Sequence, residues 1–200
     1  MRFPHLAKRL INSMRIFIIV LFSLSPFILK GQTLSEYNTL DSTHFSTILD
    51  SIKSKFSTNK TIEFEHELAL YTALSYYPSL KTTRIKFKKS KIKTTLNVRP
   101  TIGSTIFRSK ENRKYIVRFN KHRKDSVINY LDIPFNARVG VLAHEFAHIA
   151  DYNSRNFFQL FSRATDYSTK KTKAKFEKEI DSLTIKKGLG WQLHHWSHSL

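Results

Sequence analysis

The spacing of apolar residues predicts two helices in the first part of the chain. Between residues 34 and 57, apolar side chains recur every three or four positions, which indicates a weakly amphipathic helix. The pattern is stronger in residues 61–77, whose apolar side chains fall on one side of a helix. Proline cannot continue a helix, so we expect this second helix to end at Pro78.

Three segments in the middle of the chain have the composition of β-strands. Residues 82–87, 91–98 and 114–119 are rich in Thr, Ile, Val and aromatic residues, and apolar and polar positions partly alternate in them. Pro100 and Gly103 interrupt the stretch between the last two segments, as expected of a loop. We therefore expect a small, mostly antiparallel sheet.

Two further helices follow the strands. Pro134 precedes a helical pattern in residues 136–152, and a second pattern in residues 169–187 stops at Gly188. The order of helix, strands and helices predicts an α+β fold in which helices cover one face of the sheet. The chain has only five Gly and five Pro and no linker rich in them, so residues 32–200 are expected to form one domain.

The first 31 residues have the pattern of a targeting segment. A basic stretch comes first, and an apolar run of 14 residues follows at positions 16–29, broken only by two Ser and one Pro. This run is shorter than the ~20 residues that span a bilayer as a helix. We expect residues 1–31 to be a signal peptide that exports the protein to the periplasm or the extracellular space. The alternative is an uncleaved membrane anchor at residues 16–29.

Charge and the lack of cysteine limit the chemistry. The chain has 34 Lys and Arg against 15 Asp and Glu, a formal net charge of +19. Such an excess favours contact with an anionic envelope surface, although a soluble protein from a lysine-rich proteome would have the same composition. Because there is no Cys, disulfides, thiolate zinc sites and cysteine nucleophiles are excluded. Any metal ion has to be bound by His and carboxylate groups.

A metal-binding motif, HEFAH at positions 144–148, lies in the first of the two later helices. Its two His residues, His144 and His148, project from one face of the helix and can bind one Zn²⁺. Glu145 lies about 100° further round the helix and can reach a water on the metal. Apolar residues fall on the opposite side, so the helix can pack on the sheet and present its ligands to a cleft. Gly140, one turn earlier, is expected to leave room on the ligand side.

A catalytic zinc site needs a third protein ligand and an open position for water. The metzincin pattern requires Gly and His at two positions where this chain has Asp151 and Ser154, so that class is excluded. Asp166 is one option, although its segment lacks the Gly that precedes the ligand Asp of aspzincins.

The helix expected at residues 169–187 is a better source of the third ligand. Glu177 and Asp181 lie about 40° apart on its inward side, whereas Glu179 falls among lysines on a solvated face. We expect Glu177 to bind the metal and Asp181 to orient a zinc-binding His through its other ring nitrogen. The alternative is a surface cluster of carboxylates that pair with Lys.

The motif and the later carboxylates together resemble a known family. HEFAH followed by Glu-x-x-x-Asp resembles the gluzincin metallopeptidases, and FEKEID at positions 176–181 is similar to a segment of the HtpX and CAAX-prenyl-protease group. The resemblance covers residues 140–190 well and implies a zincin-like fold. That group has several membrane spans and this chain has at most one, so it is more similar to a single-domain minigluzincin.

The resemblance also implies a mechanism for the hydrolysis of a peptide or protein substrate. Zinc bound by His144, His148 and Glu177 would polarise the scissile carbonyl and activate a water. Glu145 would act as the general base, taking a proton from this water and passing it to the leaving amine. Asp181 would be the supporting carboxylate.

Two further roles are expected of a peptidase of this kind. A donor to the oxyanion is required, for which His194, His195 and Tyr152 are candidates. In folds that the chain resembles, the strand before the zinc helix is an edge strand that aligns the substrate, which would be residues 114–119. The tail HHWSH, at positions 194–198, is expected to be an exposed, frayed terminus rather than a second metal site.

Two other functions remain open from the sequence. One is a binding protein of the cell envelope that keeps zinc for structure and does not turn over, against which the presence of Glu145 argues. The other is a basic, SprT-like nucleic-acid-binding protein, built on a lysine-rich segment: Lys86, Lys88, Lys89, Lys91 and Lys93. An exported protein meets little DNA, so no specific nucleic acid is expected. The oligomeric state does not follow from the sequence.

Overall fold

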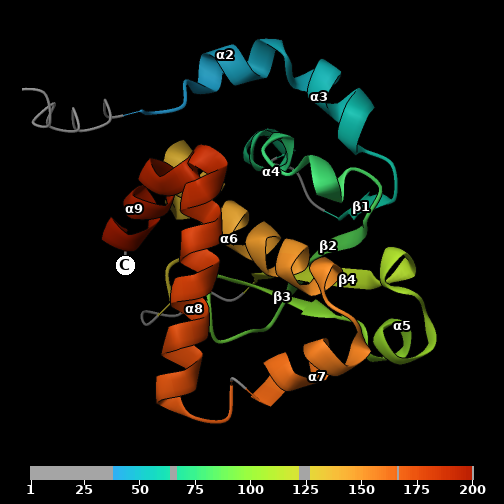
Figure 1. Ribbon diagram of the computed structural model, residues 1–200. Coiled ribbons are helices and arrows are strands. Elements are labelled where there is room, and N and C mark those ends of the chain that lie inside the picture. Colours follow the sequence, from blue (N-terminus) through green and yellow to red (C-terminus); the bar gives the residue numbers. More distant parts are fainter. Residues whose placement is uncertain (1–37, 64–66, 122–126, 166, 200) are drawn as a thin grey trace, which may run out of the picture. The chain divides into compact units, whose positions relative to one another are not determined.

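The computed structural model describes residues 38–63, 67–121, 127–165 and 167–199. Residues 39–200 form one compact unit that contains helices and a small sheet, so the α+β class is confirmed (Figure 1). The expected signal peptide or anchor lies outside the described residues. Of the helices that are described, none is long and apolar enough to cross a membrane.

Four strands form one mixed sheet in the order β1-β2-β4-β3. Their bounds are Lys60–Ile62 for β1, Arg84–Ser90 for β2, Leu96–Pro100 for β3 and Lys114–Asn120 for β4. β1 pairs with β2 and β2 with β4 in parallel, and β3 pairs with β4 antiparallel. The expectation of a mostly antiparallel sheet is therefore wrong. A helix between β1 and β2 returns the chain to the same end of the sheet, and the antiparallel strand β3 returns it before β4 begins.

The start of the second expected helix is also different. Thr61 and Ile62 belong to β1, where they pair with Lys86 and Phe87 of β2. β-Branched residues suit an extended backbone next to another strand, and this pairing outweighs the helical pattern. The helix itself, α4, spans Glu67–Ser75. It ends before Pro78, which begins a short 3₁₀ turn at Pro78–Leu80.

Seven further α-helices complete the described part of the chain. They are α2 Ser42–Thr47, α3 Leu49–Phe56, α5 Ile102–Phe107, α6 Phe135–Ser154, α7 Phe157–Thr165, α8 Lys170–Thr184 and α9 Gly190–His198. A π turn, Ile185–Leu189, joins α8 to α9, and Gly188 has a φ of 83° in it. Glycine adopts this left-handed conformation without steric cost, so the expected helix stop at Gly188 is confirmed.

The central helix α6 buries its apolar side against the sheet. The ring of Phe146 contacts the rings of Phe87 on β2 and Tyr77, and Tyr115 on β4 stacks on Tyr152. Tyr77 also donates a hydrogen bond to the carbonyl oxygen of Ala143, which lies in α6. These contacts hold α6 across one face of the sheet (Figure 1), and Phe146 and Ala147 of the HEFAH motif belong to the core.

Gly140 allows the last helix to touch α6. A Cβ atom at this position would lie 2.0 Å from the carbonyl oxygen of Gln192 and 2.7 Å from the backbone nitrogen of Leu193, both on α9. Only glycine permits such an approach of two backbones. The room at Gly140 therefore serves packing between helices and not the ligands. The C-terminal segment is a helix packed on α6, so the expectation of a frayed terminus is wrong.

We predict that Gly140→Ala separates α9 from α6 and destabilises the protein by about 2 kcal/mol. Overpacking costs up to about 3 kcal/mol, and the higher helix propensity of Ala offsets about 1 kcal/mol of it. Chemical denaturation measures the change. Gly103→Ala in α5 is the control, because its added methyl group meets no atom within 4 Å. This control is expected to be neutral or stabilising, and equal stability of the two variants would contradict the prediction.

Candidate metal centre and cleft

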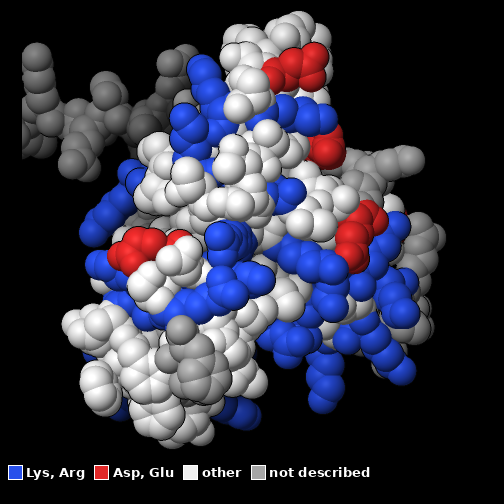
Figure 2. Space-filling model, turned by 90° about the vertical axis from the view of Figure 1, so that its right-hand side faces the viewer, with Lys and Arg blue, Asp and Glu red and all other residues white. Residues whose placement is uncertain are grey.

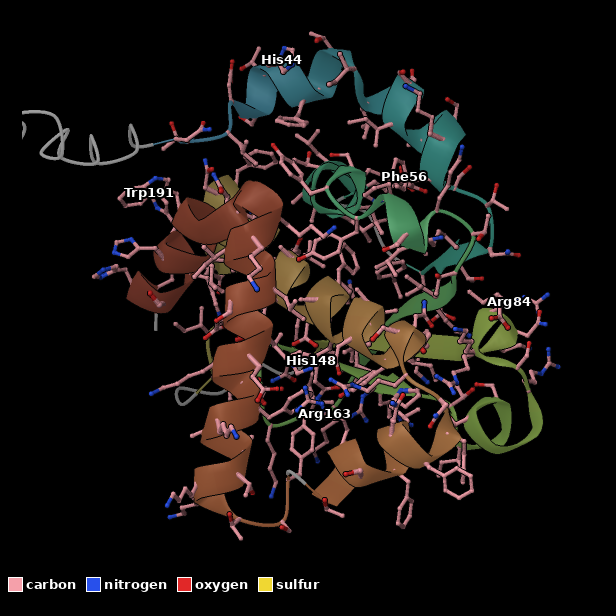
Figure 3. The ribbon with its side chains drawn as sticks, in the orientation of Figure 1. His44, Phe56, Arg84, His148, Arg163 and Trp191 are labelled. Atoms are coloured by element: carbon pink, nitrogen blue, oxygen red, sulfur yellow. The ribbon has the colours of Figure 1, made fainter. Side chains whose placement is uncertain are left out.

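Helix α6 places both motif histidines on the side that faces α8. Their rings lie edge to face, with centroids 4.9 Å apart. His148 is buried and its ring also contacts Phe176 of α8 at 5.3 Å, edge to face. Figure 3 labels His148 close to where α6, α7 and α8 meet. Packing against α8 therefore fixes the direction in which His148 points.

Glu177 of α8 completes a group of three possible metal ligands. Its Oε2 atom lies 3.2 Å from Nε2 of His144 and 3.3 Å from Nε2 of His148. Donor atoms that bind one tetrahedral Zn²⁺ at the usual bond lengths lie about 3.3 Å apart. Among the described residues this is the one group of three His, Asp or Glu side chains with convergent ligand atoms. Two nitrogens and one carboxylate oxygen are a donor set that suits zinc.

Asp181 lies one turn after Glu177 and contacts the other nitrogen of His144. Nδ1 of His144 and Oδ1 of Asp181 are 2.8 Å apart, a hydrogen-bond distance. A carboxylate in this position keeps the proton on Nδ1, so that Nε2 presents its lone pair to a metal. Nδ1 of His148 is buried and has no hydrogen-bond partner in the described part of the chain. Among the described side chains, a carboxylate therefore contacts the Nδ1 atom of His144 but not that of His148.

The two carboxylates change the charge state of His144. Burial lowers the pKa of His144, but the hydrogen bonds to Asp181 and Glu177 raise it more, to about 10. For Glu177, burial raises the pKa, and the hydrogen bonds to both His outweigh this and leave the pKa well below its usual value. At neutral pH the group therefore holds a proton between carboxylates, which a metal cation would have to displace.

Glu145 lies beside the ligand group and is not part of it. Its side chain is buried, and burial raises its pKa, although the two imidazoles and a hydrogen bond from the backbone of Val98 lower it. Val98 belongs to β3, so the carboxyl group is held between α6 and the edge of the sheet. A carboxylate with a raised pKa near a metal site is suited to proton transfer.

A cleft of about 800 Å³ opens beside this group, and β3 forms one wall of it. β3 lies at the edge of the sheet, whereas β4 lies between β2 and β3. The expectation that residues 114–119 are the edge strand is therefore wrong. β4 lies inside the sheet because it pairs with β2 on one side and with β3 on the other. α5 and α7 supply other parts of the wall, with Ile102, Phe157 and Phe161 among the lining residues.

Three polar side chains also line the cleft: Tyr152 of α6, Arg163 of α7 and Tyr167, which follows α7. The sequence indicated only Tyr152. Arg163 pairs with Glu179 of α8 at 2.5 Å and lies near Asp151 of α6, so it joins three helices (Figure 3). Glu179 is thus not on a purely solvated face. Tyr167 hydrogen-bonds to Tyr152, and burial raises the pKa of Tyr167 to about 12. No local pattern could find Arg163 or Tyr167, because each acts through contacts between distant segments.

The other candidates have separate positions. His194 and His195 lie on α9 and are not among the described residues that line the cleft. Nε2 of His194 is 3.1 Å from Nε2 of His198, and the ring of His194 contacts that of Trp191. Figure 3 shows Trp191 on the outer side of α9, away from His148. Asp166, the alternative third ligand, lies outside the described residues.

Searches against protein-family models, curated proteins and solved structures found no match to this chain. The function therefore has to be argued from the site, in which His144, His148, Glu177 and Glu145 border one cleft and Asp181 contacts His144.

We predict that zinc binding releases about one proton at neutral pH, because the raised pKa of His144 keeps its ring protonated there. Apparent affinity then rises about tenfold per pH unit between about pH 7 and 9, and the rise ends near the pKa. Calorimetric titration in buffers of different ionisation enthalpy counts the protons. Asp181→Asn removes a carboxylate that raises the pKa of His144, so this variant is expected to release fewer protons when zinc binds. A binding enthalpy that does not depend on the buffer would contradict the prediction.

Proposed function

We propose that this protein is a zinc-dependent metalloendopeptidase of the gluzincin type, with a zincin-like domain. The observation that carries the proposal is the convergence of Nε2 of His144, Nε2 of His148 and Oε2 of Glu177, with Glu145 buried beside them. Three protein ligands and an adjacent cleft are typical of a catalytic zinc site, whereas structural sites are closed by four ligands. The proposal includes export of the protein, with residues 1–31 as its signal peptide or anchor.

Zinc in this site would supply Lewis-acid chemistry to the scissile carbonyl and to a water. Glu145 takes a proton from the attacking water and delivers it to the leaving amine. A pKa raised by burial brings this carboxylate nearer to neutral pH, where a group can both accept and donate a proton. Glu145 also favours catalysis over a purely structural role, because a structural zinc site needs no buried carboxylate beside its ligands.

The substrate is proposed to lie extended along β3. An edge strand has unpaired backbone groups, and a peptide can add to it as a further strand while the adjacent cleft accepts its side chains. Val98 of β3 hydrogen-bonds to Glu145, so a peptide on this strand passes close to the general base. Tyr152 and Tyr167 both line the cleft, and Tyr167 is the more exposed of the two. Tyr167 is therefore the better candidate for the oxyanion donor.

The proposal predicts that Glu145→Gln binds zinc as the wild type does but hydrolyses an unstructured protein at least about 100-fold more slowly. The amide keeps the shape of the side chain and cannot take the proton. Zinc content is measured by mass spectrometry, and hydrolysis by release of peptides from casein.

Two variants test the assignment of the site. Glu177→Gln removes the charged ligand and is expected to lose most of its zinc together with its activity. Glu63→Gln changes an exposed glutamate that pairs with Lys86 away from the cleft, and is expected to keep both. Wild-type activity in Glu145→Gln would refute the mechanism, and full zinc content in Glu177→Gln would refute the ligand assignment.

A further inference from the structure

Large hydrophobic side chains are exposed mainly at one place on the described surface. Five of the seven that are exposed lie on α5, on α7 or in the loop after α7: Ile102, Phe157, Phe158, Phe161 and Tyr167. The exposed fractions of Ile102, Phe158 and Phe161 are 79%, 81% and 68%. Single exposed apolar residues are ordinary, whereas a cluster of this size marks an interaction surface.

Helix α7 has its apolar side turned outward. Of its four large apolar residues only Leu160 is buried, while the three Phe are exposed. The rings of Phe157 and Phe158 contact each other at 5.6 Å and form part of one ridge. An amphipathic helix in a soluble domain normally buries this side, so α7 is arranged to bury it against something else.

A cluster of lysines follows directly in the chain. Residues 157–176 contain four Lys, one Arg and a single Asp, and all four Lys lie in the first half of α8: Lys170, Lys171, Lys173 and Lys175. All four are exposed. Cations are unfavourable near the N-terminus of a helix, where the dipole is positive, and like charges three or four positions apart repel each other. The four lysines therefore lower the stability of the first half of α8.

The ridge and the lysines are close together. Phe157, Phe161, Tyr167 and Lys173 line the same cleft, and Lys173 lies 6.0 Å from the ring of Tyr167. α7 and the start of α8 form the lowest part of the molecule in Figure 1. Figure 2 is turned about the vertical axis and shows a largely uncharged lobe at the bottom of the visible face, with Lys and Arg next to it. We call residues 157–165 and 167–175 the docking lobe.

We infer that the docking lobe binds to the surface of an anionic lipid bilayer. An amphipathic helix that buries aromatic side chains at the boundary of the acyl chains, next to lysines that contact lipid headgroups, is the combination that such a surface attracts. A second copy of this basic chain would bring the two lysine clusters together. A single-stranded nucleic acid needs a groove with stacking platforms, whereas this ridge is on an outward helix and continues to an aliphatic residue, Ile102.

Docking would set the mouth of the cleft at the membrane. Phe157, Phe161 and Lys173 both line the cleft and belong to the docking lobe. If the protein is the peptidase proposed above, on which this step rests, its substrates are protein segments at or near the bilayer surface. Docking itself depends neither on the metal nor on hydrolysis, so the two proposals can fail separately.

The test uses a fluorescent label on α7. The chain has no Cys, so Ser162→Cys in the full chain gives one thiol for an environment-sensitive dye and leaves all three Phe in place. Vesicles of phosphatidylcholine are compared with vesicles that contain about one third phosphatidylglycerol. Emission is expected to shift to the blue with the anionic vesicles only. The same dye at Ser182→Cys, exposed on the later part of α8, is expected to show no shift.

Paired variants identify the groups that bind. Phe158→Ser with Phe161→Ser is expected to weaken vesicle binding on the order of 100-fold, while Leu131→Ser with Ile185→Ser, two other exposed apolar residues, changes it less than about twofold. Lys170→Ala with Lys171→Ala is expected to weaken it at least about tenfold. Its matched control is Lys178→Ala with Lys186→Ala, two exposed lysines further along, with less than about a threefold change.

Three results would overturn the inference. One is a label on α7 that stays in a watery environment on anionic vesicles, whether or not the chain is attached through another segment. Another is a shift that grows with protein concentration in the absence of lipid, which assigns the ridge to a second copy. The third is a response to a single-stranded oligonucleotide but not to lipid. The same docking by Glu145→Gln supports the inference, because it separates docking from hydrolysis.

Discussion

Two carboxylates of α8 face two imidazoles of α6, and the position of both helices depends on this contact. Glu177 lies 3.2 Å and 3.3 Å from the two Nε2 atoms, and Asp181 lies 2.8 Å from Nδ1 of His144. A charged group that loses its partner in a poorly solvated place costs several kcal/mol. α8 therefore cannot shift along α6 without a large loss of stability. Because α7 connects these two helices, its place beside the cleft follows from the same constraint.

The parts of the site that could be predicted from the sequence are those that lie within one helix. Helical periodicity relates residues one turn apart, so the shared face of His144 and His148, and that of Glu177 and Asp181, could be deduced before any contact between the helices was known. The contact between Glu177 and the imidazoles was expected only because a metal site needs a third ligand. Sheet order, parallel pairing and the bridge from Arg163 to Glu179 depend on segments far apart in the chain, for which no local pattern exists.

Local rules fail at two places in this chain, one buried and one exposed. Glycine at position 140 lowers helix propensity but lets α9 approach, and the four exposed lysines at the start of α8 oppose the helix dipole. Such conflicts between local preference and the fold tend to mark functional or packing sites. A reading of the sequence by propensity alone scores them as weak positions. The three-dimensional contacts show that Gly140 serves packing between α6 and α9, whereas the lysines of α8 face outward.

The edge position of β3 raises the question of how copies of this chain avoid pairing along it. An open strand edge accepts any extended backbone, so the same groups that suit a substrate also invite fibre-like stacking between copies. β3 has only five residues, bears the exposed Arg99, and ends at Pro100, which has no amide hydrogen to donate. In the proposed function, so short an edge is enough to hold one peptide beside Glu145 but not to support a growing ladder of copies. The same five residues would then both hold the substrate and limit self-association.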